Sequence, residues 1–457
     1  MTDALVSPTD AVPTPAAGMA RRRRRHLLKP DWPFTWLFLG FPLWWALGLG
    51  AMIHPFFAVV MAAQLLQRRP IKVPRGFGIW CLYVMWVFGS AIGLHQGTPI
   101  AYVYRLIMYL SITVIFVWVY NMPRDVLPTA KVLKVLMGFF FIVLAGGWLG
   151  VLLPSGGFTS PAEAFLPAAL TSNSFVHDLI HPAFAQVQDF LGYPLGRPKA
   201  PFVYTNDWGS VYALLCPLFF AVWLQNPRKR FRGYAILAFS LVPVFLSLNR
   251  GLWLSLGIAL LYAGTRPGPV GSFSRKALAT LAIVGFALLV FTPLSKVVED
   301  RASHAHSNEG RAYLYEETWK AVKSSPLIGY GGPLPVDKQR ILPAIGTQGQ
   351  LWNVMISQGA VGTILFVGFL LRMTWATRRG PTITFWAHVV LVVALVQLPI
   401  YDMMPTPLHI VFVVAAMGLR ELHEPDRPDA ASRSKSRSSS KTGHVDAPTE
   451  HAASVST

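Results

Sequence analysis

The chain has 457 residues, of which 53% are hydrophobic and only 13% are charged. Soluble globular proteins carry about 25% charged residues, so a soluble enzyme is excluded. The net charge of +19 does not indicate a nucleic-acid partner, because the 40 Lys and Arg lie in short clusters between apolar stretches. The composition therefore predicts an all-α polytopic membrane protein whose main partner is the lipid bilayer.

Twelve apolar segments follow one another along the chain, and about 20 such residues span a bilayer as a helix. The transmembrane domain is predicted at 34–420, between a disordered basic N-terminal tail at 1–33 and a disordered C-terminal tail at 421–457. The twelve predicted spans are 34–48, 50–66, 76–94, 99–121, 133–153, 206–225, 232–248, 250–265, 277–297, 351–371, 382–401 and 405–420.

The distribution of basic residues orients these spans, because loops rich in Lys and Arg stay in the cytoplasm. With both tails cytoplasmic, every predicted cytoplasmic loop carries at least three Lys or Arg, whereas the short outer turns at 95–98 and 402–404 carry none. Two long loops, 154–205 and 298–350, then lie outside the cytoplasm. Aromatic residues near span ends, such as Trp208 and Tyr401, are interpreted as interfacial anchors.

Both outer loops carry helical patterning. In the second loop, Arg311, Tyr315, Thr318 and Val322 recur on one helix face, Pro326 ends the helix, and a glycine-rich segment follows. In the first loop, apolar residues predict short amphipathic helices on the membrane surface: Phe175, Leu179, Phe184, Val187 and Phe190.

Polar residues gather at the outer span ends. Arg105 lies about six residues inside its span, a depth at which an ionisable group usually faces a polar cavity. Arg105, Arg250 and Arg311 have no evident carboxylate partner, so we expect them to converge and bind an anion, for which diphosphate suits their geometry. The other polar residues at the outer ends are Asn206, Asp207, Asn249, Gln348, Gln350, Asn353 and Asp402.

No metal or cofactor is predicted. His177 and His181 have the i, i+4 spacing of two ligands on one helix, but no acidic third ligand is evident and Pro182 follows at once.

Four segments resemble the O-antigen ligase and polymerase superfamily of bacterial membrane glycosyltransferases, in that family's order. They are GRPKAPFVYTNDWGSVYALLCPL at 196–218, LSLNRGLWLSL at 246–256, GRAYLYEETWKAVKSSPLIGYG at 310–331 and TQGQLWNVMISQGAVG at 347–362. The third segment resembles the family's arginine-bearing helix, followed by a proline and then by a Gly-x-Gly that falls on Gly329 and Gly331.

The resemblance implies a GT-C-like fold and a metal-independent, inverting transfer on the outer face of the bacterial cytoplasmic membrane. The donor would be a glycan on undecaprenyl diphosphate, and the acceptor a hydroxyl of a glycan or glycolipid. Arg250 and Arg311 would hold the donor diphosphate, with Asn206 and Arg105 beside it. Arg105 is included because of its depth in the membrane and is not a residue of the family's motifs. Asp207, Gln350, Asn353 and Asp402 are placed on the acceptor side.

One position departs from the family. Ligases carry a His-Asn pair where this chain has Gln348-Gly349, and a glutamine orients a hydroxyl but does not take its proton. A polymerase or another glycan transferase of the superfamily is therefore favoured over ligation to lipopolysaccharide. Either another group is the base, or the base is dispensable because bond breaking runs ahead of attack. The candidates for the base are Glu309, Glu316, His304, His306, Asp207 and Asp402.

A transporter or flippase of lipid-linked glycans is the alternative from another class. Transporters often show two matching halves with polar, broken helices near the midplane. The two halves of this chain show no convincing repeat, and its charges lie at the outer ends of the spans. A transferase of the peptidoglycan-polymerase type also handles a lipid diphosphate, and only the four segments above separate the two enzymes.

Overall fold

The computed structural model describes residues 29–94, 99–189, 194–291, 306–335 and 344–423, with only the backbone described at 188–189, 194, 284–291 and 306–311. Most of the two predicted tails lies outside these ranges. His304 and Phe190 also lie outside them, as do the side chains of Glu309, His306 and Arg311.

Each of the twelve predicted spans contains helix. In chain order the helices are α1 (Trp32–Leu39) with α2 (Phe41–Ala46), α3 (Ile53–Leu66), α4 (Phe77–Gly89) with η1 (Ser90–Gly93), α5 (Pro99–Asn121), α6 (Thr129–Leu152), α10 (Thr205–Phe219) with η2 (Phe220–Leu224), α11 (Arg230–Leu246), α12 (Arg250–Gly264), α13 (Pro269–Phe291), α16 (Gln350–Thr377), α17 (Thr382–Gln397) and α18 (Thr406–His423).

Four helices of the described chain are long and apolar enough to cross a membrane: α5, α6, α10 continued by η2, and α16. The protein is thus a mostly helical, multi-pass membrane protein, while the number of twelve crossings stays a prediction. The first predicted span, 34–48, is not one helix. It divides at Gly40 into α1 and α2, because Pro42 has no N–H with which to continue the hydrogen-bond ladder of α1.

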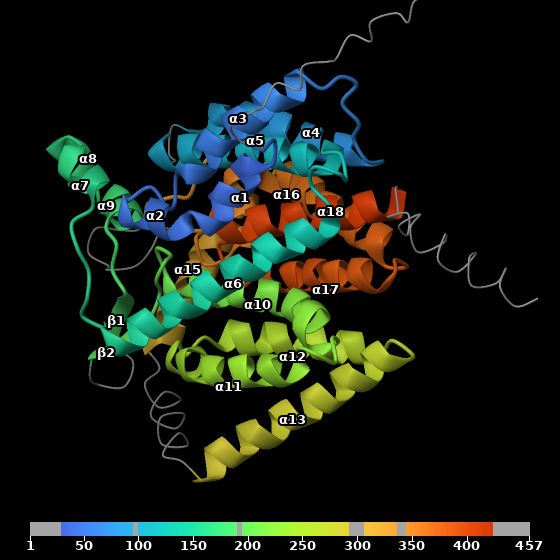
Figure 1. The fold of residues 1–457 in the computed structure, drawn as a ribbon. Helices are drawn as coiled ribbons and strands as arrows, with labels where there is room; N and C mark the ends of the chain where they lie inside the picture. The colour runs from blue at the N-terminus through green and yellow to red at the C-terminus, as the bar shows by residue number, and fades with distance from the viewer. Residues whose placement is uncertain (1–28, 95–98, 190–193, 292–305, 336–343, 424–457) are drawn as a thin grey trace, which may run out of the picture.

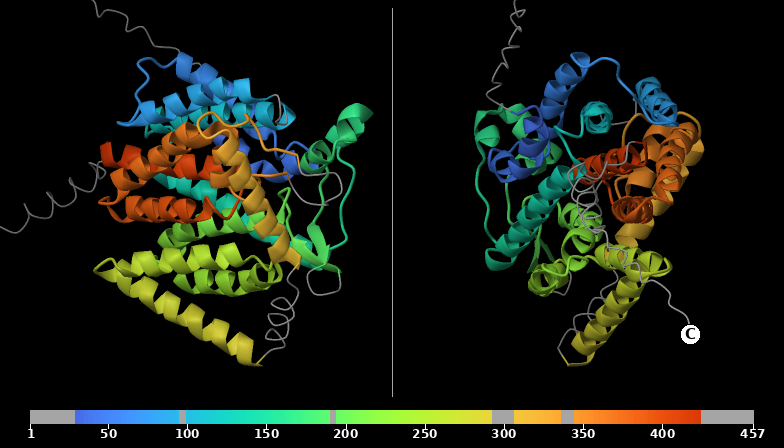
Figure 2. Two further views of the ribbon diagram at one scale, coloured as in Figure 1. Left: turned by 180° about the vertical axis from the view of Figure 1, so that it is seen from behind. Right: turned by 45° about the vertical axis from the view of Figure 1, so that its right-hand side comes forward.

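Helix α10 forms the centre of the bundle. In its apolar, membrane-spanning stretch 83% of the residues are buried, against 50–56% in the other three long helices. It packs against α6, α12, α17 and α18, whereas α3 pairs with α5 and α4 with α16. Helix α13 packs against α12 at the edge of the bundle and diverges from it (Figures 1 and 2).

The first long loop covers one end of the bundle, at the left of Figure 1. It contains α7 (Pro161–Phe165), α8 (Ala168–Thr171) and α9 (Ser174–Ile180), followed by the antiparallel strands β1 (Ala185–Asp189) and β2 (Pro194–Pro198). Short helices were expected here, and Phe175 and Leu179 pack from α9 onto the core. The prediction of helix at Phe184 and Val187 is wrong. This stretch follows Pro182, which prevents α9 from continuing. Its residues alternate between apolar and polar (AQVQ), a pattern typical of a strand, and they form β1.

Candidate active site

Three predicted outer segments meet at Tyr401, which precedes α18. The Tyr401 hydroxyl donates to Asn249 Oδ1, and the Asn249 amide donates to the Thr205 carbonyl over 3.3 Å. The Tyr401 carbonyl accepts the backbone N–H of Gln350 at 2.6 Å. Since Thr205 begins α10, Asn249 caps α12 and Gln350 begins α16, three helix N-termini converge on one residue.

Two glycines allow this close approach. A Cβ on Gly209 would collide with the Asn249 amide, and one on Gly251 would lie 2.5 Å from the Tyr401 hydroxyl. The Asn-Arg-Gly turn of the second family-like segment therefore needs its glycine for packing against Tyr401. Tyr401 is 2% exposed and Trp208 fully buried, so the interpretation of both as interfacial anchors is wrong.

Each N-terminus carries backbone N–H groups that lack partners inside the helix, together with the positive end of the helix dipole. Anions bind at such ends. Arg250 is the first residue of α12 and is exposed, with no hydrogen-bond or ion-pair partner among the described residues. Asn206 is half-buried in the first turn of α10. This part of the site is therefore electropositive and accessible.

Arg105 differs from Arg250. Its two terminal nitrogens donate to the two carboxylate oxygens of Asp402, at 3.3 and 2.5 Å, and its side chain is 8% exposed. The expectation that Arg105 has no carboxylate partner is therefore wrong. This ion pair joins α5 to the segment that precedes α18, next to Tyr401.

The side chain of Gln350 completes the junction at the start of α16. Its amide donates to the Tyr109 hydroxyl at 3.1 Å, and its carbonyl accepts the Met403 N–H at 3.2 Å. Asn353, one turn further along α16, is fully buried, and its amide nitrogen and oxygen have no partner among the described residues. Buried polar groups without partners are rare in proteins and often mark functional sites.

Helix α15 (His306–Ser324) lies against the start of α16. Gln348 donates to the Thr318 hydroxyl at 2.8 Å and accepts the Gly346 N–H at 3.0 Å, while the rings of Tyr315 and Trp352 lie 5.1 Å apart. The predicted face of α15 thus packs inward, and the helix ends two residues before Pro326, as expected. Arg311 lies one turn before Tyr315 in the same helix.

Glu316 lies on the opposite, exposed face of α15. Its carboxylate is 2.9 Å from the Lys320 ammonium, and the hydrogen bond and charge of Lys320 lower its pKa below the ordinary range. Of the two glutamates proposed as bases on α15, Glu316 is therefore directed away from the α16 junction, and the side chain of Glu309 lies outside the described residues.

The glycine-rich segment after α15 fills a break in α16. At Gly359 (φ +64°) the helix is kinked, and the Ala360 N–H donates to Pro326 O at 2.7 Å instead of to Ile356 O. Ile356 O accepts from Tyr330 N at 2.9 Å, so the loop replaces the lost helical bond. Gly329 and Gly331 both have left-handed φ angles and lie in close packing. The role that the structure shows for these glycines is to let the loop after α15 pack closely against the kink of α16.

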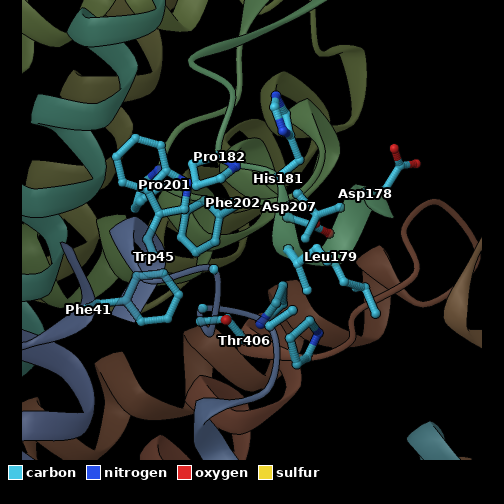
Figure 3. Close-up of a pocket in the computed structure, with 17 residues that line it drawn as sticks. Phe41, Trp45, Asp178, Leu179, His181, Pro182, Pro201, Phe202, Asp207 and Thr406 are labelled. Atoms are coloured by element: carbon cyan, nitrogen blue, oxygen red, sulfur yellow. The ribbon is translucent and has the colours of Figure 1, made fainter. Parts of the chain in front are cut away.

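A cleft opens beside the start of α10 (Figure 3). Phe41, Trp45 and Phe202 line one side of the cleft, and His181, Asp178 and Asp207 lie along the other. Neither Arg250 nor Gln348 is among the described residues that line the cleft. Asp207 is 6% exposed and accepts the Tyr204 N–H at 3.2 Å. Of the predicted site residues, Asp207 alone lines this cleft.

Two titratable groups outside the spans, Tyr204 and Lys199, interact with the carboxylates of Asp178 and Asp207, which line the cleft. The Tyr204 hydroxyl donates to Asp178 at 3.0 Å, and burial, followed by the charges of Asp178, Asp207 and Asp402, raises the pKa of Tyr204. Burial lowers the pKa of Lys199, and the charges of Asp178 and Asp207 offset part of that effect. Sequence reasoning missed Tyr204 and Lys199, although both lie in the first family-like segment.

A second polar cluster lies on the first outer loop. Glu163 Oε2 is 2.8 Å from His181 Nδ1, and Glu163 Oε1 is 3.4 Å from His177 Nε2. Glu163 supplies the acidic ligand that the sequence did not reveal, so these three residues have the donor set of a metal site.

Comparison with known proteins agrees with the predicted resemblance. No curated protein matches the chain. Residues 202–360 match the family model described as O-antigen ligase, a range that runs from just before α10 to the kink of α16. Over this part the resemblance of the membrane protein to the O-antigen ligase and polymerase superfamily is therefore confirmed, and the match supports, in general terms, glycan transfer of that type.

Proposed function

We propose that this protein transfers a glycan from undecaprenyl diphosphate to a sugar hydroxyl of a glycan or glycolipid acceptor, on the outer face of the cytoplasmic membrane. The observation that carries the proposal is the convergence of α10, α12 and α16 on Tyr401. All three helices begin within the part of the chain that matches the O-antigen ligase family.

The donor diphosphate is assigned to the accessible N-terminus of α12. Arg250 is free to form two parallel hydrogen bonds with a phosphate group, and Arg311 from α15 is proposed to contribute the second guanidinium. Asn206, in the first turn of α10, is proposed to bind the diphosphate beside these arginines. Arg105 is already held by Asp402, so we assign it a positioning role at the junction beside the diphosphate.

The chemistry requires one glycosidic bond to form as another breaks. The acceptor hydroxyl attacks the anomeric carbon from the face opposite the diphosphate, the bond to the diphosphate oxygen breaks with its electron pair, and the configuration inverts. The departing diphosphate is a stable anion, so fixed positive charge stabilises it in the transition state without a general acid. We propose that two arginines supply this charge and that the transfer is metal-independent.

The hydroxyl proton also needs a destination. Asp207 is our candidate base, because it lines the cleft and sits one residue from Asn206. The acceptor hydroxyl alone is accordingly proposed to enter the cleft, with Gln350, Asn353 and Asp402 behind it in the junction. Gln348 is engaged by Thr318 and Gly346, which suits a residue that fixes α15 rather than one that removes a proton. We therefore favour a polymerase.

The proposal is tested with Arg250→Ala and Arg311→Ala, and with Arg232→Ala as the matched control. Arg232 is an exposed arginine in the first turn of α11, at the end of that helix that is remote in sequence from Arg250. Each protein is purified, reconstituted in lipid nanodiscs and given a lipid-diphosphate-linked repeat unit, and the glycan length of the products is measured. Nanodiscs have no enclosed compartment, so transport alone yields no product.

We expect each site variant to lose roughly 100-fold or more of the transfer rate, while Arg232→Ala keeps the wild-type rate. Full activity in both site variants would exclude the diphosphate site. If the wild-type protein forms no new glycosidic bond but moves the lipid-linked unit across a proteoliposome membrane, the transporter alternative is correct. An Asp207→Asn variant that keeps the wild-type rate would exclude Asp207 as the base.

A further inference from the structure

The Glu163, His177 and His181 cluster on the first outer loop forms a site that the proposed transfer reaction does not use. We propose that these three side chains bind one divalent transition-metal ion, for which zinc is the first candidate, and that the ion fastens α7 to α9. Three donor atoms, one from each residue, lie within 4.8 Å of one another.

The donor set suits zinc or another transition metal more than magnesium or calcium. Two imidazoles and one carboxylate are frequent zinc ligands, whereas Mg²⁺ and Ca²⁺ prefer sites made of oxygen atoms. With zinc bonds of about 2.0–2.1 Å, neighbouring donors of a tetrahedral site lie about 3.3 Å apart. The two glutamate-to-histidine distances, 2.8 Å to Oε2 and 3.4 Å to Oε1, end on different oxygens of the carboxylate. The three donor atoms, which lie within 4.8 Å of one another, therefore have to draw together by side-chain rotation to reach that spacing.

The local sequence builds this arrangement. Ser160 caps α7 by accepting the Glu163 N–H at 3.1 Å, and its hydroxyl donates to Ile180 O at 2.7 Å. This bond ties the start of α7 to the end of α9. Asn173 caps α9, and the i, i+4 spacing stacks the His177 and His181 rings with centroids 5.0 Å apart. Two short helices thereby direct their ligand atoms to one point.

The three side chains are accessible to an ion. The exposed fractions are 45% for His177, 32% for His181 and 16% for Glu163. Without an ion, His181 and Glu163 hydrogen-bond to each other. An incoming ion replaces the shared proton, because a ligating histidine nitrogen must be deprotonated. Three protein ligands leave one tetrahedral position for water, an arrangement that also occurs in catalytic zinc sites.

The position of the cluster suggests its consequence. His181 and Ile180 line the cleft, and the Ala162 N–H donates to Leu47 O at 3.1 Å, which docks α7 on the loop after α2. A metal ion would therefore hold one wall of the cleft in place. This consequence for the acceptor rests on the proposed function, whereas metal binding itself does not.

The test uses the full-length protein, purified in detergent with an affinity tag that contains no histidine and treated with EDTA. Zinc is titrated in competition with a chromophoric chelator, and Co²⁺ is added separately because its visible absorption reports a tetrahedral site. Glu163→Gln and the double variant His177→Ala/His181→Ala are compared with His423→Ala. His423 is an exposed histidine at the end of α18 with no carboxylate partner among the described residues.

We expect one zinc ion per chain in the wild-type protein and in His423→Ala. Loss of an outer-shell partner alone weakens metal binding about 10–100-fold, so removing the two histidines should weaken it at least 100-fold, and the tetrahedral Co²⁺ spectrum should disappear. Glu163→Gln keeps both histidines and the capping geometry, and should weaken binding without unfolding the loop. Equal zinc affinity in wild type and Glu163→Gln, or no zinc bound by the wild type, would overturn the proposal.

A second measurement separates metal binding from loop folding. Limited proteolysis of the segment 161–181 should slow when zinc is added to the wild-type protein and stay unchanged in the double variant. Identical cleavage rates with and without zinc in the wild type would contradict the fastening role. Glycan transfer by Arg250→Ala is measured independently, so failure of the metal site and failure of the proposed function give different results.

Discussion

Arg105 and Asp402 form a two-point ion pair that joins the outer part of α5 to the segment before α18. The two residues are 297 positions apart in the chain. Asp402 directly follows Tyr401, so the pair fixes the position of the residue on which α10, α12 and α16 converge. Arg105 therefore acts on the proposed site through its partner, not as a free anion-binding group.

Arg105→Ala is expected to destabilise the protein, because it leaves the Asp402 carboxylate without its partner. The loss should be near the lower end of the about 3–5 kcal/mol typical of broken buried pairs, since a quarter of the Asp402 side chain is exposed. The measurement is the thermal midpoint in detergent by fluorescence-detected gel filtration. Arg105→Ala/Asp402→Ala should recover part of the loss, and a double variant less stable than either single variant would contradict this account.

The sequence was sufficient for the features that depend on local pattern. Apolar stretches predicted the helices, and the loop charges placed Asn206, Arg250 and Gln350 on one side, where the three helix starts do meet. It was not sufficient for pairings between distant segments. The spacing of His177 and His181 predicts two ligands, but Glu163 comes from a separate short helix. Likewise, nothing local to Tyr401 indicates that the starts of α10, α12 and α16 converge on it.

The kink of α16 leads to a prediction about Gly329. Its φ is +75°, and an added Cβ would lie 2.6 Å from Ile356 O. Gly329→Ala should therefore destabilise the protein by more than about 1 kcal/mol and weaken the joint between the α15 loop and α16. Gly368→Ala is the control, because a Cβ on Gly368, which lies in α16, would meet no atom within 4 Å. Equal thermal midpoints for the two variants would show that the joint tolerates a side chain.

The resemblance implies a histidine in ligases at the position of Gln348, and the hydrogen bond of Gln348 to Thr318 distinguishes two roles for this residue. If Gln348 holds α15 against α16, Thr318→Val removes the same 2.8 Å hydrogen bond and should lower the transfer rate as much as Gln348→Ala. If Gln348 contacts the acceptor, only Gln348→Ala should impair transfer. We expect the two variants to match, with the main effect on turnover and little change in the KM for acceptor.

Lys199 gives the protein a pH dependence at alkaline pH. Because burial lowers its pKa, the folded protein binds fewer protons than the unfolded chain between that lowered value and the ordinary lysine pKa of about 10.4. Stability contributed by this group therefore rises with pH across that window, opposite to the behaviour of a lysine whose pKa is raised by an ion pair.

Lys199→Met should remove this rise from the thermal midpoints measured between about pH 8 and 10.4. Lys134→Met, at an exposed lysine of α6, should leave it intact, and the same slope in wild type and Lys199→Met would mean that Lys199 is not its source.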